Sequence, residues 1–259
     1  MRAVFVAIMI MLPAFILPGV TQSGLEFTRI VATVAAVFVI YEYGFLTPSV
    51  IEFRDAAPYN RIRFFMFLSF VLVPAQLISN VLSGHPLTGV LASFAKNAFS
   101  LANFSFSPVT IVAKTLSGSD LVLREAVAQA IALNVMICVF AIITFAVAVF
   151  GGLWRCDGDR FNMWHNMPSY KSYGATGMQT RLANSAFASF LIACLIPLLG
   201  PTAADLFTVW FSETGKLPPI AVTWFIALWV YLPATFLMRA IFLAKVAMTH
   251  ANKTHWMPM

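Results

Sequence analysis

The stretch AVAQAIALNVMICVFAIITFAVAVFGGLW, residues 126–154, decides the fold class because it contains no Asp, Glu, Lys or Arg. About 20 helical residues are enough to cross a bilayer core of roughly 30 Å. The stretch is longer than this, so it predicts a transmembrane helix. The whole chain agrees, since 60% of its 259 residues are hydrophobic and only 10% are charged, against about 25% charged in soluble domains. This composition predicts an integral membrane protein and excludes disordered, fibrous and disulfide-rich secreted proteins.

Apolar runs of similar length predict an all-α polytopic membrane helix bundle of about six transmembrane helices, forming one transmembrane domain over residues 1–259. The first run is short and contains Pro13 and Pro18, and it also fits a signal peptide. Small residues before a cleavage site are missing, so we expect an uncleaved first helix. The predicted spans are residues 3–20, 28–47, 64–82, 126–154, 182–204 and 220–240, with an outer loop at 85–120, an inner loop at 155–181 and a C-terminal tail at 241–259.

The basic residues predict how the bundle is oriented. Alternating spans place 11 of the 16 Lys and Arg residues on the side of the termini and 5 on the other side, and positive charge collects on the cytoplasmic side. Both termini are therefore expected in the cytoplasm, and the protein itself is expected in the inner membrane of a bacterium. The net charge of +6 is explained by this asymmetry, so no nucleic-acid partner is expected. The 11 are Arg2, Arg54, Arg61, Arg63, Arg155, Arg160, Lys171, Arg181, Arg239, Lys245 and Lys253, and the 5 are Arg29, Lys96, Lys114, Arg124 and Lys216.

The outer loop, residues 85–120, contains an amphipathic pattern. Apolar residues recur every three or four positions, which predicts a helix lying in the membrane interface or packing against a partner protein. Ser119 or Asp120 is expected to be the N-cap of the following span. The apolar stripe consists of Leu87, Val90, Leu91, Phe94, Ala98 and Leu101, and the polar face consists of Thr88, Ser93, Lys96, Asn97 and Ser100.

Two ionisable residues lie inside predicted spans, where a charge at the centre costs about 2.5–3.5 kcal/mol. Glu42 and Arg239 both lie near the inner ends of their helices. They predict an intramembrane ion pair or a proton-responsive carboxylate. The alternative is that Arg239 snorkels to the headgroups while Glu42 reaches interfacial water.

Small and polar side chains inside the spans favour close helix packing. Ala126, Ala130, Asn134 and Cys138 recur every four residues and form a helix-packing face, with Asn134 able to bond to a neighbouring helix. Further polar residues predict either a polar path or ordinary packing contacts, and packing is the commoner use. They are Gln76, Asn80, Asn184, Ser185 and Ser189.

The sequence predicts no cofactor, although lipids or pigments fit the Phe-rich helix faces. The best metal candidates are Cys156, Asp157, Asp159 and His165, whose spacing matches no common site, so a metal is not expected. All four His residues lie outside the spans, which excludes haem ligation by two histidines within the bilayer. The chain also lacks a GxSxG nucleophile motif and a GxxxxGK[ST] nucleotide loop.

Three functions remain open. The first is a non-catalytic accessory or structural subunit of a larger membrane complex, with membrane lipids and other subunits as partners. It packs through small-residue faces and Phe-rich faces such as Phe64, Phe65, Phe67 and Phe70. The second is a small-solute channel or transporter, weakened by few charges in the spans and by the lack of an internal repeat. The third is a membrane-embedded lipid-modifying enzyme that uses the inner loop.

Overall fold

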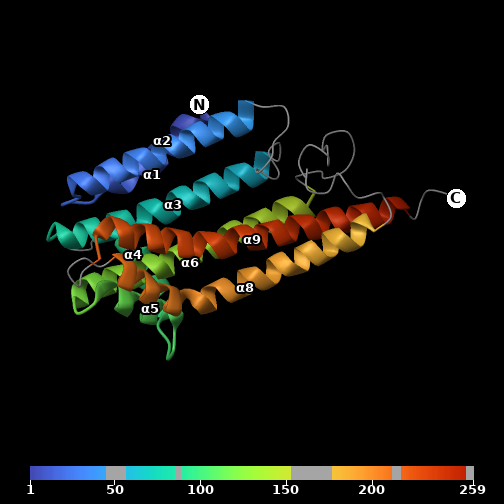
Figure 1. Ribbon diagram of the computed structural model, residues 1–259. Helices are drawn as coiled ribbons and strands as arrows, with labels where there is room; N and C mark the ends of the chain where they lie inside the picture. Colours follow the sequence, from blue (N-terminus) through green and yellow to red (C-terminus); the bar gives the residue numbers. More distant parts are fainter. Residues whose placement is uncertain (45–56, 86–88, 153–176, 212–216, 255–259) are drawn as a thin grey trace. The chain divides into compact units, whose positions relative to one another are not determined.

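The computed structural model describes residues 1–44, 57–85, 89–152, 177–211 and 217–254, and these residues form an all-α structure. The described residues contain eight helices (Figure 1). They are α1 (Arg2–Ile16), α2 (Gln22–Gly44), α3 (Ala57–Leu82), α4 (Val90–Ala102), α5 (Pro108–Ser117), α6 (Leu121–Phe150), α8 (Met178–Phe211) and α9 (Pro219–Thr254).

Five helices, α2, α3, α6, α8 and α9, are long and apolar enough to cross a membrane. Their length and composition support an integral membrane protein with several spans. The predicted first span, residues 3–20, is a shorter apolar helix. The 15 residues of α1 rise about 22 Å at about 1.5 Å each, which is less than the roughly 30 Å of hydrocarbon.

Local sequence signals explain several helix boundaries. α1 stops at Ile16 because Leu17 precedes Pro18 and is extended, with φ −79° and ψ 130°. α6 starts after Asp120, whose Oδ1 accepts a hydrogen bond from the backbone N–H of Leu123 at 2.9 Å. This bond confirms Asp120 as the N-cap.

The chain divides into two compact units. Unit 1 comprises Met1–Ile40, Met66–Cys138 and Ile196–Tyr231, and unit 2 comprises Tyr41–Phe65, Val139–Leu195 and Leu232–Met259. All five long helices, α2, α3, α6, α8 and α9, contribute a segment to each unit.

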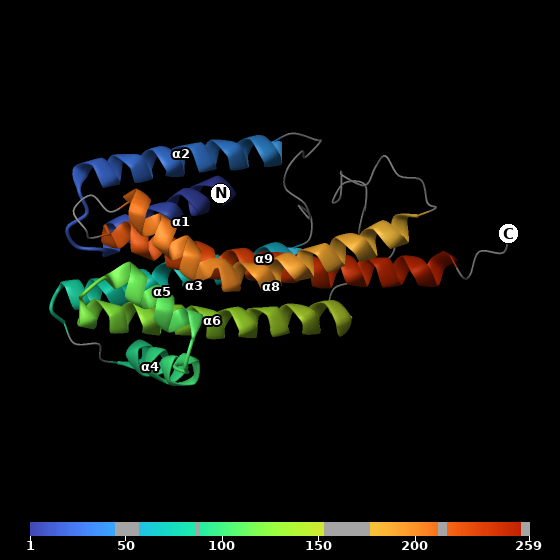
Figure 2. The same ribbon diagram turned by 60° about the horizontal axis from the view of Figure 1, so that its bottom comes forward.

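The core of unit 1 forms around the first half of α6. Both views place the short helices α4 and α5 beside this segment (Figures 1 and 2). α5 buries an apolar face with the helical spacing i, i+3, i+4 and i+7. Its four core residues are Val109, Val112, Ala113 and Leu116, which pack with side chains of α3, α4, α6, α8 and α9.

Aromatic rings lie at the core of unit 2. The Tyr59 ring meets the Phe145 ring edge-on at 5.4 Å between centroids and lies 6.3 Å from the Phe242 ring. α9 remains helical to Thr254, whereas the sequence interpretation treats residues 241–259 as a tail. The physical reason is that buried residues continue at helical spacing beyond residue 240, at Phe242, Leu243, Val246 and Ala247.

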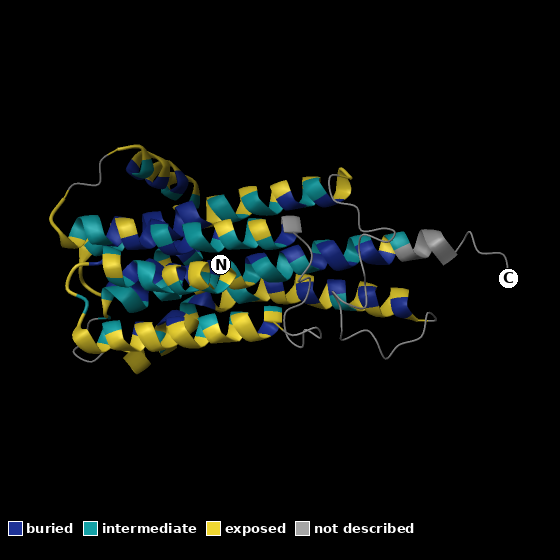
Figure 3. Cartoon of the chain, turned by 90° about the horizontal axis from the view of Figure 1, so that it is seen from above, coloured by how far each residue is buried: buried dark blue, intermediate teal, exposed yellow. Residues whose placement is uncertain are grey.

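α2 is the most exposed of the five long helices, and exposed positions cover most of it (Figure 3). Within unit 1 its buried positions are Thr28 and Ala32, one turn apart. The remaining surface of the helix is largely apolar, and its exposed large side chains include Phe27, Ile30, Val31, Val34, Val37 and Phe38.

Candidate functional site

A buried hydrogen bond joins α6 to α3 in unit 1. Pro74 has no backbone N–H, so the carbonyl of Phe70, four residues earlier, loses its helical partner. The Nδ2 of Asn134 donates to this carbonyl at 3.0 Å, and Asn134 is fully buried. The asparagine therefore satisfies a carbonyl that the proline leaves open.

The predicted packing face of α6 lies in a segment that is buried on every side. Ala126, Ala130 and Asn134 are fully buried, and Cys138 is partly exposed. All residues from 126 to 134 are buried, so the spacing of four describes only part of the contact surface. Alanines allow neighbouring helices to approach closely here.

A second polar contact lies in unit 2. The Nη1 of Arg239 on α9 donates to the Oγ of Ser189 on α8 at 2.7 Å. Ser189 is buried and donates in turn to the Ser185 carbonyl at 2.8 Å. Glu42, in the same unit, is also buried, and both Glu42 and Arg239 make further interactions. The Glu42–Arg239 ion pair stays a prediction.

The residues proposed for a polar path divide between the two units. In unit 1, Gln76 is exposed, and its Nε2 donates to the Oδ1 of Asn80 at 3.0 Å. In unit 2, Ser189 is buried while Asn184 is exposed. The side chains of Gln76, Asn80 and Ser189 therefore have partners within their own helices, and Ser189 also accepts from Arg239.

Two more polar contacts connect helices of unit 1. The Oγ of Ser79 on α3 donates to the Ile16 carbonyl at the end of α1, at 2.8 Å. The Oγ1 of Thr115 on α5 donates to the Oδ1 of Asp205 on α8 at 3.2 Å. Helix ends leave carbonyls without intrahelical partners, and Ser79 supplies a partner for one of them.

Aromatic contacts hold α9 against its neighbours in unit 1. Phe67, from the Phe-rich run of α3, lies 4.4 Å from Tyr231 and 6.2 Å from Trp224 between ring centroids. A Cβ built on Gly200 of α8 would overlap the ring of Trp229. The sequence interpretation did not single out Gly200, although its place between Pro197 and Pro201 was a usable signal.

Two cations lie over aromatic rings in unit 2. The guanidinium carbon of Arg63 is 5.1 Å from the centre of the Tyr59 ring, and Nζ of Lys245 is 5.5 Å from the centre of the Phe150 ring. Both distances fall in the range of cation–π contacts. Basic and aromatic side chains of this kind anchor helices at membrane interfaces.

The burial pattern of α4 separates it into three faces. One face is buried at Ala92, Ala95 and Ala98, and Ala95 and Ala98 belong to the unit 1 core. The predicted apolar stripe is divided, because Leu91 and Ala98 pack at the core whereas Val90, Phe94 and Leu101 are exposed. The described residues of the predicted polar face are all exposed, namely Ser93, Lys96, Asn97 and Ser100. Leu87 and Thr88 lie outside the described residues.

The proposed metal ligands Cys156, Asp157, Asp159 and His165 also lie outside the described residues. Where the structure is described, no group of three His, Cys, Asp or Glu side chains is close enough to hold a metal ion.

No protein-family model matches the chain, and neither the curated proteins nor the solved structures include a significant match.

Proposed function

We propose that the protein is a non-catalytic accessory or structural subunit of a larger membrane complex. The observation that supports this proposal is that buried polar side chains form hydrogen bonds between helices. Asn134 bonds to α3, and Arg239 bonds to Ser189 across two helices. Asn134, Arg239 and Ser189, which are polar and lie inside apolar helices, act here as contacts between helices, which is the usual role of such residues in membrane bundles.

The exposed helix faces supply the surface on which other subunits would pack. Phe27 on α2, Phe140 on α6 and Phe187 on α8 are all exposed. In a bilayer such side chains contact lipid tails or another protein. Aromatic residues contribute strongly to protein interfaces because of their large, rigid apolar area.

Orientation is inferred from the sorting of the basic residues by the predicted spans, which places 11 of the 16 on the side of the termini and 5 on the other side. We place the end of α9 in the cytoplasm, in a bacterial inner membrane, and α4 in the interface on the opposite side. With α1 as a sixth, short span, the N-terminus is cytoplasmic as well.

A small-solute channel or transporter is the second candidate. The observation in its favour is that Arg239 and Glu42 lie within apolar helices, because charged residues in such positions often mark pathways. Flux through liposomes containing the purified chain alone would favour this candidate.

The lipid-modifying enzyme is the third candidate, and it depends on Asp157, Asp159 and His165. The double variant Asp157→Asn with Asp159→Asn tests it. Loss of lipid turnover while assembly stays intact would support the enzyme.

Extraction from native membranes in a mild detergent tests the main proposal. A native gel followed by mass spectrometry should show the chain migrating with other subunits at a fixed ratio. The same ratio should persist after a second, orthogonal purification step. Migration as a monomer or as a homo-oligomer would contradict the accessory role.

A further inference from the structure

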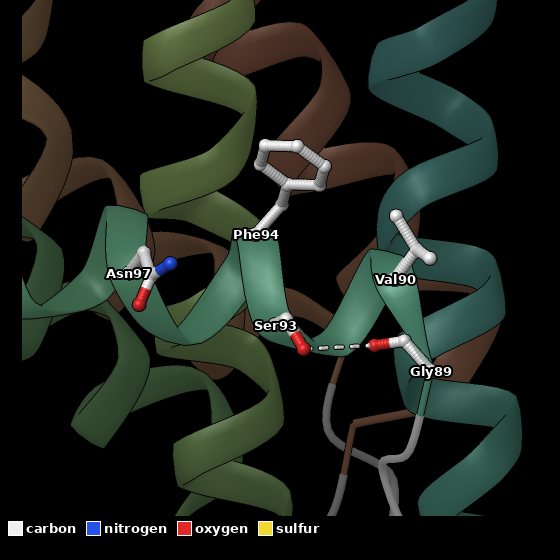
Figure 4. A pocket seen from close by; sticks show the side chains of 5 residues that line it. All are labelled: Gly89, Val90, Ser93, Phe94 and Asn97. Carbon is white, nitrogen blue, oxygen red and sulfur yellow. Dashed lines mark hydrogen bonds between the residues drawn. The ribbon is translucent and has the colours of Figure 1, made fainter.

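The inference concerns α4 and rests on its proposed place in the membrane interface. Ala95 and Ala98 of this 13-residue helix belong to the buried core of unit 1, and Leu91 and Phe99 pack partly buried against the same core. At about 1.5 Å per residue it is about 20 Å long, too short to cross a bilayer. Figure 4 shows α4 running across its neighbouring helices.

The exposed part of α4 is half apolar and half polar. Val90, Phe94 and Leu101 are 74%, 54% and 81% exposed, and they follow one another at helical spacing. Ser93, Lys96, Asn97 and Ser100 form the polar side. This order of protein-facing, apolar and polar faces is expected for a helix that touches the bundle, the lipid tails and the headgroup region at once.

A groove of about 380 Å³ opens where the apolar and polar faces meet. Its lining residues are Gly89, Val90, Ser93, Phe94 and Asn97. Val90 and Phe94 point to the same side of α4, and the amide of Asn97 lies at the groove edge (Figure 4). The Oγ of Ser93 donates to the Gly89 carbonyl at 3.1 Å, so this hydroxyl already has a partner.

The chemistry of the groove matches one end of a phospholipid. The Phe94 ring and Val90 offer an apolar wall for an acyl chain, and the amide of Asn97 offers a donor for an ester or phosphate oxygen. Lys96, the residue before Asn97, adds a positive charge on the polar face. We infer that this groove binds a phospholipid from the bilayer, with its acyl chain on Phe94 and its glycerol–phosphate region at Asn97.

Retention of lipid by the purified chain tests the inference. The chain is reconstituted in vesicles of equal parts phosphatidylethanolamine and phosphatidylglycerol, extracted, and measured by native mass spectrometry. Phe94→Ala with Asn97→Ala should retain about tenfold less lipid, as expected for the loss of one apolar and one polar contact. Leu101→Ala with Ser100→Ala is the matched control on the same helix and should retain the native amount.

The outcomes are distinct. The headgroup of the retained lipid shows whether the groove binds an anionic or a zwitterionic phospholipid. Equal retention by both double variants, or no retention by the native chain, overturns the inference. Circular dichroism and gel filtration establish that each variant is folded.

A second measurement tests the placement of α4 separately. A nitrobenzoxadiazole dye is attached at Phe94→Cys, Leu101→Cys or Lys96→Cys after Cys138, Cys156 and Cys194 are replaced by Ala. Lipids brominated along the acyl chain should quench the dye at 94 and 101, and aqueous iodide should quench it at 96. Iodide quenching at all three positions would overturn both the placement and the lipid site. Neither measurement requires a partner subunit, so the accessory role stands or fails independently.

Discussion

At the scale of single residues, the bond between Asn134 and the Phe70 carbonyl exists because Pro74 cannot donate to that carbonyl. An acceptor buried in an apolar helix bundle costs about 1–3 kcal/mol when it has no donor. Asn134 therefore removes a penalty that the sequence itself creates in α3.

A double-mutant cycle measures this relation. Asn134→Ala should destabilise the bundle by about 1–2 kcal/mol, and by clearly less when Pro74→Ala restores the N–H that bonds to Phe70. The measurement is reversible unfolding in mixed detergent micelles. Gln129→Ala is the control, because buried Gln129 bonds to Glu125 instead, and its effect should add to that of Pro74→Ala within about 0.5 kcal/mol. If the effects of Asn134→Ala and Pro74→Ala on stability were also simply additive, the proposed relation between Asn134 and Pro74 would be wrong.

Gly200 offers a second prediction. In a helix interior Ala is favoured over Gly by about 1 kcal/mol, but a Cβ here overlaps the Trp229 ring, and overpacking costs typically about 1–3 kcal/mol. We expect Gly200→Ala to lower the thermal unfolding midpoint and Trp229→Phe to recover part of the loss. Gly44→Ala is the control because nothing lies within 4 Å of its added Cβ. A raised midpoint for Gly200→Ala would argue against the close approach of α8 and α9.

At the scale of elements, the contact between α8 and α9 in unit 2 depends on Arg239 and Ser189. If Glu42 also pairs with Arg239, Arg239→Leu leaves a buried carboxylate without its partner, which costs about 3–5 kcal/mol. The yield of folded protein by gel filtration should then fall sharply for Arg239→Leu and recover when Glu42→Gln is added.

The control is Ser189→Ala, which removes one acceptor and leaves every charge in place. It should reduce the yield only slightly. No recovery in the Arg239→Leu, Glu42→Gln double variant would eliminate the ion pair and leave Arg239 as a partner of Ser189.

Sequence reasoning found the long helices because apolar length alone reveals them. It also found the Asp120 cap, which is a local signal. It missed α5, even though Pro108 at its first turn and Gly118 after its last residue are typical boundary signals. The long predicted loop obscured a helix of only ten residues.

Contacts between helices were the part that the sequence could not provide. Periodicity shows which face of a helix is apolar, but it does not identify the neighbour. The apolar stripe predicted for α4 illustrates this, since Ala92 and Ala95 are buried while Val90 and Phe94 are exposed. Alanines form the centre of the packed face, with Leu91 and Phe99 partly buried beside them, while Val90, Phe94 and Leu101 are exposed.

At the scale of the whole molecule, the charge distribution predicts the side of the membrane on which each end lies. In a cysteine-free background, Ser119→Cys should react with a membrane-impermeant maleimide in intact cells. Thr254→Cys should react only after the inner membrane is permeabilised. The reverse pattern would invert the topology and would place α4 on the cytoplasmic side.

The accessory role requires that exposed helix faces contact other subunits. Photo-crosslinking in the native membrane detects such contacts, with benzoylphenylalanine replacing the exposed Phe27, Phe140 or Phe187 in turn, and the buried Phe70 as the control. At least one exposed position should give a discrete adduct with a defined partner protein, and Phe70 should give none. Adducts with lipid alone at all three exposed positions would contradict the accessory role.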